Sequence, residues 1–231
     1  MTEARQLLSG MERFSPSGAY DPTTDKRPFT IAASDYQIEI IIKPLINRLR
    51  SIAPQMQLRV LRAHAQDEWV GLLRAGSTDL VLSIELKTNE SDLMLQRVLS
   101  EDEDICYCDP AHRAPPNTLD RYCAAPHVIM APGKFRTTIV DQRLAEQGRH
   151  RQIALSLPSF STGATILRGT DMVALMPFRL RSTVFAGIAT CPPPFDLSRD
   201  TITQTWHSKT YASPRHRWLR AQVQAAVTGT A

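Results

Sequence analysis

The chain has 231 residues, of which 42% are hydrophobic and 22% charged, so it can bury one large core or two smaller ones and has the composition of a soluble globular protein. No apolar run approaches the roughly 18–20 residues that span a bilayer, and the opening MTEARQLLSG lacks the apolar core and cleavage site of a secretory signal. The net charge of +4 is only mildly basic, and we expect a cytoplasmic protein that does not associate with membranes.

The first segment is a helical fragment, residues 1–13, in which Leu7, Leu8 and Met11 share one face. Residues 14–28 are rich in Pro, Ser, Thr and Gly, which predicts a linker. We expect the compact part of the chain to begin after it.

The compact part opens with a β-run, residues 29–33, which is closed by Ser34 and Asp35. Either residue is a good N-cap for a helix. A long helix is predicted from there to about Ser51, because apolar residues recur every three or four positions, and Pro54 stops it.

A strand, a helix ended by Gly76 and an apolar strand follow, at residues 57–61, 67–75 and 79–84. The order β-α-β-α-β predicts a parallel sheet with right-handed crossovers. Two further strand-like runs come next, at 93–99 and 104–107.

The pattern starts again after a proline-containing break at residues 109–118. Strands are predicted at 127–130, 152–157, 172–175 and 201–206, and helices at 119–124, 135–147, 161–168, near 178–185 and at 214–227. The repetition indicates an α/β fold of two similar Rossmann-like lobes with a ligand cleft between them. We expect a first lobe of residues 27–110 and 206–231 and a second lobe of residues 111–205.

The cysteine pattern argues against a disulfide scaffold or a zinc site. The chain has four cysteines, two of them in the alternating run Ile105-Cys106-Tyr107-Cys108, which is too few for a stapled secreted domain. A zinc site would need a second pair at ligand spacing, and none is present. We expect reduced structural thiols, no metal and no cofactor.

The densest basic spots are two triplets, Arg149-His150-Arg151 and Arg215-His216-Arg217. Both fall near the ends of predicted helices, where solvated charge is the ordinary expectation. Neither provides the one-faced basic surface of a DNA-binding domain.

The sequence motifs of common enzyme classes are absent. The chain contains no G-x-S-x-G elbow, no H-E-x-x-H, no phosphate-binding G-x-x-x-x-G-K-[ST] and no G-x-G-x-x-G. Ser, His and Asp occur, but no spacing brings them together as a triad. We therefore expect a binding protein and not an enzyme.

Four stretches resemble, in order and spacing, the effector-binding domain of LysR-type transcriptional regulators: RPFTIAASDY (27–36), PLINRLRSIAPQMQLRVL (44–61), LLRAGSTDLVLS (72–83) and LPSFSTGATILRGTDMVALMP (157–177). The late stretch TWHSKTYASPRHRWLR (205–220) is similar to the branch that senses aromatic inducers, which includes naphthalene/salicylate and nodulation regulators. The resemblance covers residues 27–227 and implies the type 2 periplasmic-binding-protein fold.

The chain departs from the family pattern at its start. Family members carry a winged helix-turn-helix and a linker helix ahead of this domain, whereas 26 residues precede Arg27. The resemblance implies that residues 1–26 are the end of the linker helix and its hinge. We expect a fragment of a regulator whose DNA contacts belong to the missing N-terminal domain.

The resemblance also places several segments on the cleft. The candidate effector-binding residues are Ser34, Asp35, Tyr36, His64, Pro132, Lys134, Phe135, Ser159, Phe160, Ser161, Thr162, Trp206 and His207. Helix N-termini attract carboxylates through free N–H groups and the helix dipole. Hydroxyl donors and aromatic rings suit a flat organic ligand.

Each candidate also has a plain structural interpretation. Ser34 and Ser161 could simply cap helices, Lys134 and His64 could lie on the surface, and Trp206 could pack in the core, which is the favoured interpretation for that residue. The negative charge of Asp35 would repel an acidic effector.

These observations predict a domain that binds a small organic effector, most naturally an aromatic or other carboxylic acid, and that forms a homodimer, with higher oligomers in the full-length protein. A stand-alone solute-binding protein of the periplasmic type is the first alternative, because it shares the two-lobed fold. A dimerisation domain with a degenerate pocket is the second, and it predicts no response to any ligand.

Overall fold

The computed structural model describes residues 20–62, 66–84, 90–130 and 138–228, which form two compact units. Unit 1 comprises the described residues of the ranges 20–33, 41–98 and 202–228. Unit 2 comprises those of the ranges 34–40 and 99–201. The sequence had suggested boundaries at 110 and 206. The contacts place them near 98 and 202, because strand 104–108 pairs within the second sheet.

Unit 1 is built on a five-stranded sheet with the order β2-β1-β3-β10-β4. Its strands are β1 (Phe29–Ala33), β2 (Leu58–Arg62), β3 (Leu80–Ile84), β4 (Leu93–Asp102) and β10 (Asp200–His207). β1 pairs in parallel with β2 and β3, which confirms the expected β-α-β-α-β unit. β10 runs antiparallel to β3, so the complete sheet is mixed.

The predicted long helix of unit 1 is interrupted. It consists of α2 (Asp35–Gln37), a π-helical segment η2 (Ile38–Ile42) and α3 (Lys43–Ile52). Pro44 lies in the first turn of α3 and lacks the N–H that a continuous α-helix needs, which accounts for the change of hydrogen-bond pattern ahead of it.

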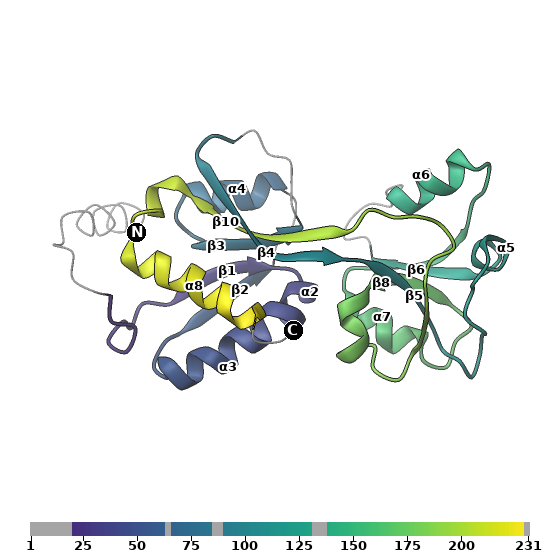
Figure 1. The fold of residues 1–231 in the computed structure, drawn as a ribbon, viewed down its shortest axis with the longest axis horizontal. Coiled ribbons are helices and arrows are strands. Elements are labelled where there is room, and N and C mark those ends of the chain that lie inside the picture. The colour runs from purple at the N-terminus through teal and green to yellow at the C-terminus, as the bar shows by residue number, and fades with distance from the viewer. Residues whose placement is uncertain (1–19, 63–65, 85–89, 131–137, 229–231) are drawn as a thin grey trace. The chain divides into compact units, whose positions relative to one another are not determined.

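Helices cover the sheet of unit 1. α3 and α8 (Pro214–Thr228) lie side by side (Figure 1). α4 (Gln66–Arg74) packs through Trp69 and Leu73 onto Ala32 and Val81 of the sheet. Gly76 ends the α4 segment as predicted, with the positive φ of 66° that favours glycine and an N–H bonded to the carbonyl of Leu73.

Unit 2 is built on a second five-stranded sheet with the order β7-β6-β8-β5-β9. Its elements are β5 (Asp104–Cys108), α5 (Leu119–Cys123), β6 (Pro126–Met130), α6 (Ile139–Glu146), β7 (Gln152–Leu157), α7 (Phe160–Leu167), β8 (Val173–Pro177), the 3₁₀ turn η3 (Phe178–Ser182) and β9 (Ala189–Cys191). The helix expected near 178–185 is therefore only a 3₁₀ turn. The three-residue strand β9 was not predicted.

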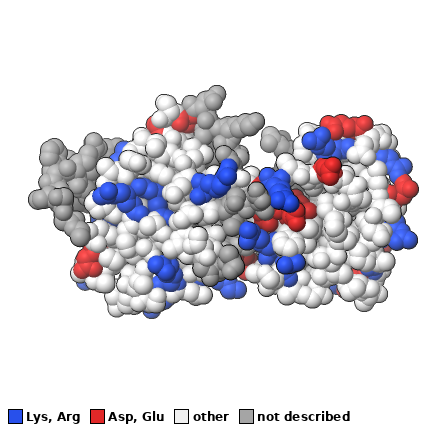
Figure 2. Space-filling view, in the orientation of Figure 1, with Lys and Arg blue, Asp and Glu red and all other residues white. Residues whose placement is uncertain are grey.

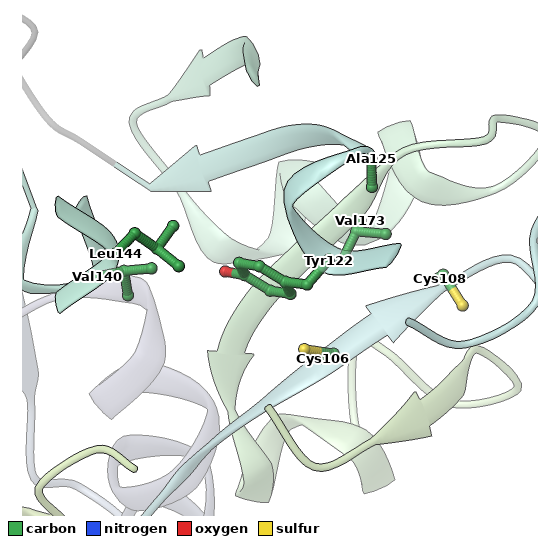
Figure 3. Packing of buried hydrophobic residues seen from close by; sticks show 7 residues of the cluster. All are labelled: Cys106, Cys108, Tyr122, Ala125, Val140, Leu144 and Val173. Carbon is green, nitrogen blue, oxygen red and sulfur yellow. The ribbon is translucent and has the colours of Figure 1, made fainter. Parts of the chain in front are cut away.

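The four cysteines meet in the core of unit 2. Cys106 and Cys108 are buried beside Tyr122, Leu144 and Val173 (Figure 3), and Cys123 and Cys191 pack against this cluster. All four are free thiols, as expected. Burial raises the pKa of every one of them, which keeps the thiols protonated at neutral pH and lowers their reactivity.

The four thiols of the native protein should be alkylated at different rates. We expect iodoacetamide to modify the half-buried Cys123 and Cys191 before Cys106 and Cys108, each only 1% exposed. Peptide mass spectrometry over time measures the order, and the denatured protein, in which all four should react alike, is the control. Modification of Cys106 as fast as Cys191 would contradict the packing.

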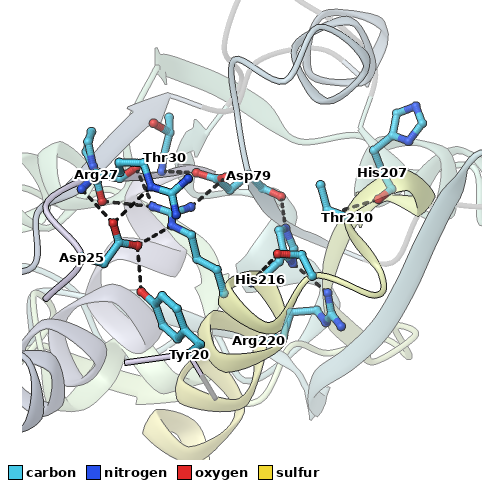
Figure 4. Close-up of polar contacts among 12 residues, drawn as sticks. Tyr20, Asp25, Arg27, Thr30, Asp79, His207, Thr210, His216 and Arg220 are labelled. Atoms are coloured by element: carbon cyan, nitrogen blue, oxygen red, sulfur yellow. Dashed lines mark hydrogen bonds and ion pairs between the residues drawn. The ribbon is translucent and has the colours of Figure 1, made fainter. Parts of the chain in front are cut away.

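The two basic triplets are less solvated than the sequence suggested. The Arg151 side chain is 3% exposed and its Nε lies 2.8 Å from Oδ1 of Asp141. Arg215 is 13% exposed and contacts Asp25 and Asp79 at 2.6 and 3.6 Å (Figure 4). These arginines are structural groups and not free surface charges, and this corrects the expectation of solvated ends.

Candidate functional site

The N-terminus of α7 is the best-formed group of predicted site residues. Ser159 is its N-cap, and the Ser159 Oγ accepts hydrogen bonds from N and Oγ1 of Thr162 at 3.4 and 3.3 Å. The Oγ atoms of Ser159 and Ser161 are 2.8 Å apart. Ser161 and Thr162 are exposed, so the first turn of α7 presents hydroxyls and N–H groups at its surface.

Residues 34–37 pack against this helix end within unit 2. Ser34 and Gln37 form a capping box, in which the Gln37 Oε1 accepts from N of Ser34 at 2.9 Å and also from its hydroxyl. This box fixes the turn that carries Asp35. Ser-x-x-Gln is a known helix-start signal, so Gln37 is a residue that the sequence could have revealed and our interpretation missed.

Asp35 occupies the anion position of α7. Its Oδ2 accepts a hydrogen bond from the backbone N–H of Ser161 at 3.1 Å. A carboxylate at a helix N-terminus is stabilised by the free N–H groups and the helix dipole. The helix end is therefore competent to hold a carboxylate, and in this structure it holds one from the chain itself.

An aromatic pair lies beside this contact. The rings of Tyr36 and Phe160 are 5.9 Å apart at 56°, Tyr36 is 3% exposed and Phe160 is half-buried. The Tyr36 hydroxyl is buried and has no hydrogen-bond partner among the described residues. A buried hydroxyl without a partner is costly, which makes it a natural contact for a ligand oxygen.

Two other candidates belong to unit 1. Trp206 is 4% exposed, and the guanidinium of Arg220 lies 4.3 Å from the centroid of its ring. This burial agrees with a packing role, the interpretation that the sequence favours for Trp206. His207 accepts from the N–H of Lys209 at 3.1 Å and approaches Asp92 at 3.4 Å. Burial and the charge of Lys209 lower its pKa.

The remaining candidates cannot be placed. His64 and the segment Pro132, Lys134 and Phe135 lie outside the described residues. Within the described ranges, no cluster of three or more His, Cys, Asp or Glu side chains could hold a metal ion. None of the described helices has both the length and the apolar character needed to cross a bilayer.

The arrangement defines a class of protein. Two α/β units, each with a five-stranded mixed sheet, and a chain that returns to the first unit at its end are features of the type 2 periplasmic-binding-like fold found in regulatory domains. The chain belongs to the LysR substrate binding domain family, which matches residues 23–228.

Individual relatives agree with this assignment. The transcriptional activator NahR of Pseudomonas putida is 29% identical over 87% of this chain and 68% of its own length. The regulator SyrM of Rhizobium meliloti is 28% identical over 90% of this chain and 64% of its own length. The crystal structure of the regulatory domain of MexT from Pseudomonas aeruginosa superposes with a TM-score of 0.75 at 27% identity, covering 88% of this chain and 99% of that domain. The chain thus spans about two thirds of these two full-length relatives.

Proposed function

We propose that this chain is the effector-sensing domain of a cytoplasmic LysR-type transcription regulator, and that it binds an aromatic carboxylic acid at the N-terminus of α7. The carrying observation is the exposed first turn of α7 beside a buried Tyr36 hydroxyl that lacks a hydrogen-bond partner among the described residues. The helix end suits the carboxylate, the hydroxyl suits a second polar group, and the Phe160 ring suits a flat apolar body.

Asp35 gives this site a resting state. An incoming carboxylate competes with the Asp35 side chain for the N–H of Ser161 and releases the turn 34–37 from α7. The contact that is lost lies within unit 2, between the turn 34–37 and the first turn of α7. The ligand shifts that equilibrium only by its differential affinity for the two states.

The whole protein's role rests on its relatives. Transcription control, DNA binding through a separate N-terminal domain and homodimerisation through this domain are proposals drawn from the regulators that this chain resembles. On the same basis we propose that the domain is a sensor without catalytic activity.

Thermal unfolding against a panel of aromatic and aliphatic carboxylates, phenols and flavonoids tests the proposal. A ligand at 100 times its Kd stabilises by about 2.7 kcal/mol, which raises the Tm by roughly 5–10 °C for a chain of this size. We expect aromatic carboxylates to give the largest rise. A flat response from a well-folded protein would favour a dimerisation domain with a degenerate pocket.

Tyr36→Phe separates a ligand contact from a packing role. Because the hydroxyl has no partner in the described part, its removal should leave the free domain as stable as the wild type or more so. The affinity for the aromatic carboxylate should fall about fivefold, or ~1 kcal/mol, for one lost hydrogen bond. Calorimetric titration measures the Kd, and an unchanged Kd would remove Tyr36 from the site.

Asp35→Asn should have the opposite effect on the Kd. It removes the carboxylate that competes at Ser161 and repels an acid, so affinity should rise about tenfold. Asp171→Asn makes the same charge change beyond the other end of α7 and should leave the Kd unchanged. Equal effects of the two substitutions would show that only net charge matters.

A further inference from the structure

An open surface pocket lies in unit 1, apart from the residues of the proposed effector site. It has a volume of about 520 Å³ and lies along α8 and the facing strand β4. Its lining residues are Gln96, Arg217, Arg220, Ala221, Gln224, Ala225 and Thr228. All of them belong to unit 1, and the volume is in the range of small-molecule sites.

One of the lining residues, Arg220, carries a buried guanidinium that lies over the Trp206 ring and has no carboxylate partner among the described residues. Arg220 is 8% exposed, and its guanidinium donates to Nδ1 of His216 at 2.7 Å and to the carbonyl of Tyr211 at 3.2 Å (Figure 4). Nε2 of His216 lies 2.7 Å from the carbonyl of Asp79, so Nε2 carries the proton and the imidazole is neutral. Within the described residues no carboxylate pairs with Arg220.

The neighbouring Arg217 adds a second positive charge. It lies one turn before Arg220 on α8 and also lines the pocket, and no ion pair involves it in the described part of the chain. Burial and the charge of Arg217 lower the pKa of Arg220, although its guanidinium also lies 4.3 Å from the Trp206 ring. A bound anion would offset both effects.

The position on α8 strengthens this argument. The helix begins at Pro214, has no acidic residue in its first turn, and carries three arginines in its first two turns, at 215, 217 and 220. Positive charge near a helix N-terminus opposes the helix dipole. Arg215 is neutralised by Asp25 and Asp79, which leaves the two arginines of the pocket.

The surroundings of the pocket favour an organic acid. Ala221 and Ala225 provide a small apolar face between the arginines and the end of α8. Gln224 also lines the pocket, and its buried side-chain oxygen has no partner among the described residues. Basic side chains gather over unit 1 on the face drawn in Figure 2, where few acidic groups are seen, so this face attracts anions.

We propose that this pocket is a second ligand site, at which Arg217 and Arg220 bind the carboxylate of a small organic acid. It does not depend on the proposed effector site, because its residues come from the other unit. A ligand bound in this pocket contacts both α8 and β4, which is an edge strand of the unit 1 sheet.

Titration of the domain with sodium benzoate and sodium salicylate, followed by amide chemical shifts of α8, tests the proposal, with sodium sulfate at matched ionic strength as a parallel arm. We expect saturable shifts at residues 216–225 and a Kd about tenfold weaker in Arg217→Gln, a substitution at an exposed side chain that should preserve the fold. Arg59→Gln, an exposed arginine on β2, and Tyr36→Phe should leave these shifts and their Kd unchanged.

Three outcomes would overturn the proposal. They are the absence of saturable α8 shifts in the folded protein, an equal Kd in Arg217→Gln and Arg59→Gln, and saturation by sulfate with no response to either organic acid. None of these outcomes would contradict the proposed effector site at α7, because the calorimetric titration of Tyr36→Phe tests that site separately.

Discussion

Asp141→Ala is expected to destabilise the domain by about 4 kcal/mol, of which about 3 kcal/mol arise because the Arg151 guanidinium is left buried without its counter-ion. The Arg151 side chain is 3% exposed, and that of Asp141 is 19% exposed, which places the loss at the lower end of the range for buried pairs. Arg151 also donates to the Tyr122 hydroxyl at 3.1 Å and to Oγ1 of Thr138 at 3.0 Å. Chemical denaturation measures the change.

The same carboxylate also caps a helix. Asp141 Oδ2 accepts from the N–H of Thr138 at 2.8 Å, and the Thr138 hydroxyl caps the N–H of Asp141, so the two form a capping box at the start of α6. Loss of this contact adds about 1 kcal/mol. Burial raises the pKa of Asp141, but the hydrogen bonds from Arg151 and Thr138 outweigh burial and hold the pKa below its ordinary value.

A neighbouring pair supplies the control. Arg149 contacts Asp120, whose side chain is 84% exposed, so Asp120→Ala should cost no more than about 1 kcal/mol. In the double variant Asp141→Ala/Arg151→Met the buried charge is gone, and stability should recover part of the loss. Equal costs for Asp141→Ala and Asp120→Ala would show that burial of Arg151 carries no energetic weight.

The contrast between these two pairs marks a limit of sequence interpretation. Arg149 and Arg151 stand two positions apart in one basic triplet, and nothing local distinguishes the exposed residue from the buried one. The partner of Arg151 lies ten residues earlier on α6, and Arg215 pairs with residues far earlier in the chain. Burial of a charge is decided by these distant partners, which hydrophobic periodicity does not record.

Regular elements were predictable where apolar periodicity is strong. The strands β1, β3 and β7 and the helices α4, α7 and α8 begin and end within about two residues of the predicted positions. The exceptions have local causes. Pro44 changes the hydrogen-bond pattern of the long helix, and β9 is three residues long beside a proline-rich stretch, too short for a period to show.

The site was predictable only in its parts. Ser34 and Ser159 carry local cap signals, and both start helices. The hydrogen bond from Ser161 to Asp35 joins residues 126 positions apart. The lack of a partner for the Tyr36 hydroxyl among the described residues is likewise a property of three-dimensional packing. Local signals give the ends of helices, whereas the fold decides which ends meet.

Stability between pH 7 and 5 is expected to be nearly flat, because two opposing sets of groups cancel. Burial lowers the pKa of both His127 and His216 to about 4. A histidine with a lowered folded pKa stabilises fully above its unfolded pKa of about 6.5, and that stability is lost as the pH falls toward 4. Each should cost about 2 kcal/mol on acidification to pH 5.

Two carboxyl groups act in the opposite direction. Burial raises the pKa of Asp102 to about 6, and burial with the nearby Asp200 and Asp102 raises that of Asp104 to about 7. A carboxyl whose folded pKa is raised binds its proton more tightly in the folded state, so stability grows as the pH falls from 7 toward the unfolded value near 4. Together they should contribute about 3–4 kcal/mol by pH 5.

Matched substitutions in unit 2 expose the cancellation. Asp104→Asn removes one stabilising proton uptake, so this variant should lose about 2 kcal/mol more than the wild type between pH 7 and 5. His127→Phe removes an opposing group and should gain about 2 kcal/mol over the same interval, although it forfeits the hydrogen bond to the Tyr122 carbonyl at every pH. Asp196→Asn, at an exposed carboxylate, should follow the wild type.

Urea denaturation at several pH values between 5 and 8 measures these slopes directly. Opposite deviations of Asp104→Asn and His127→Phe from a flat wild-type curve are the expected pattern, since each variant leaves the other set uncompensated. Parallel curves for all four proteins would mean that these buried groups keep their ordinary pKa values in the folded state. A flat wild-type profile alone would not distinguish the two cases, because cancellation and the absence of any shift give the same curve.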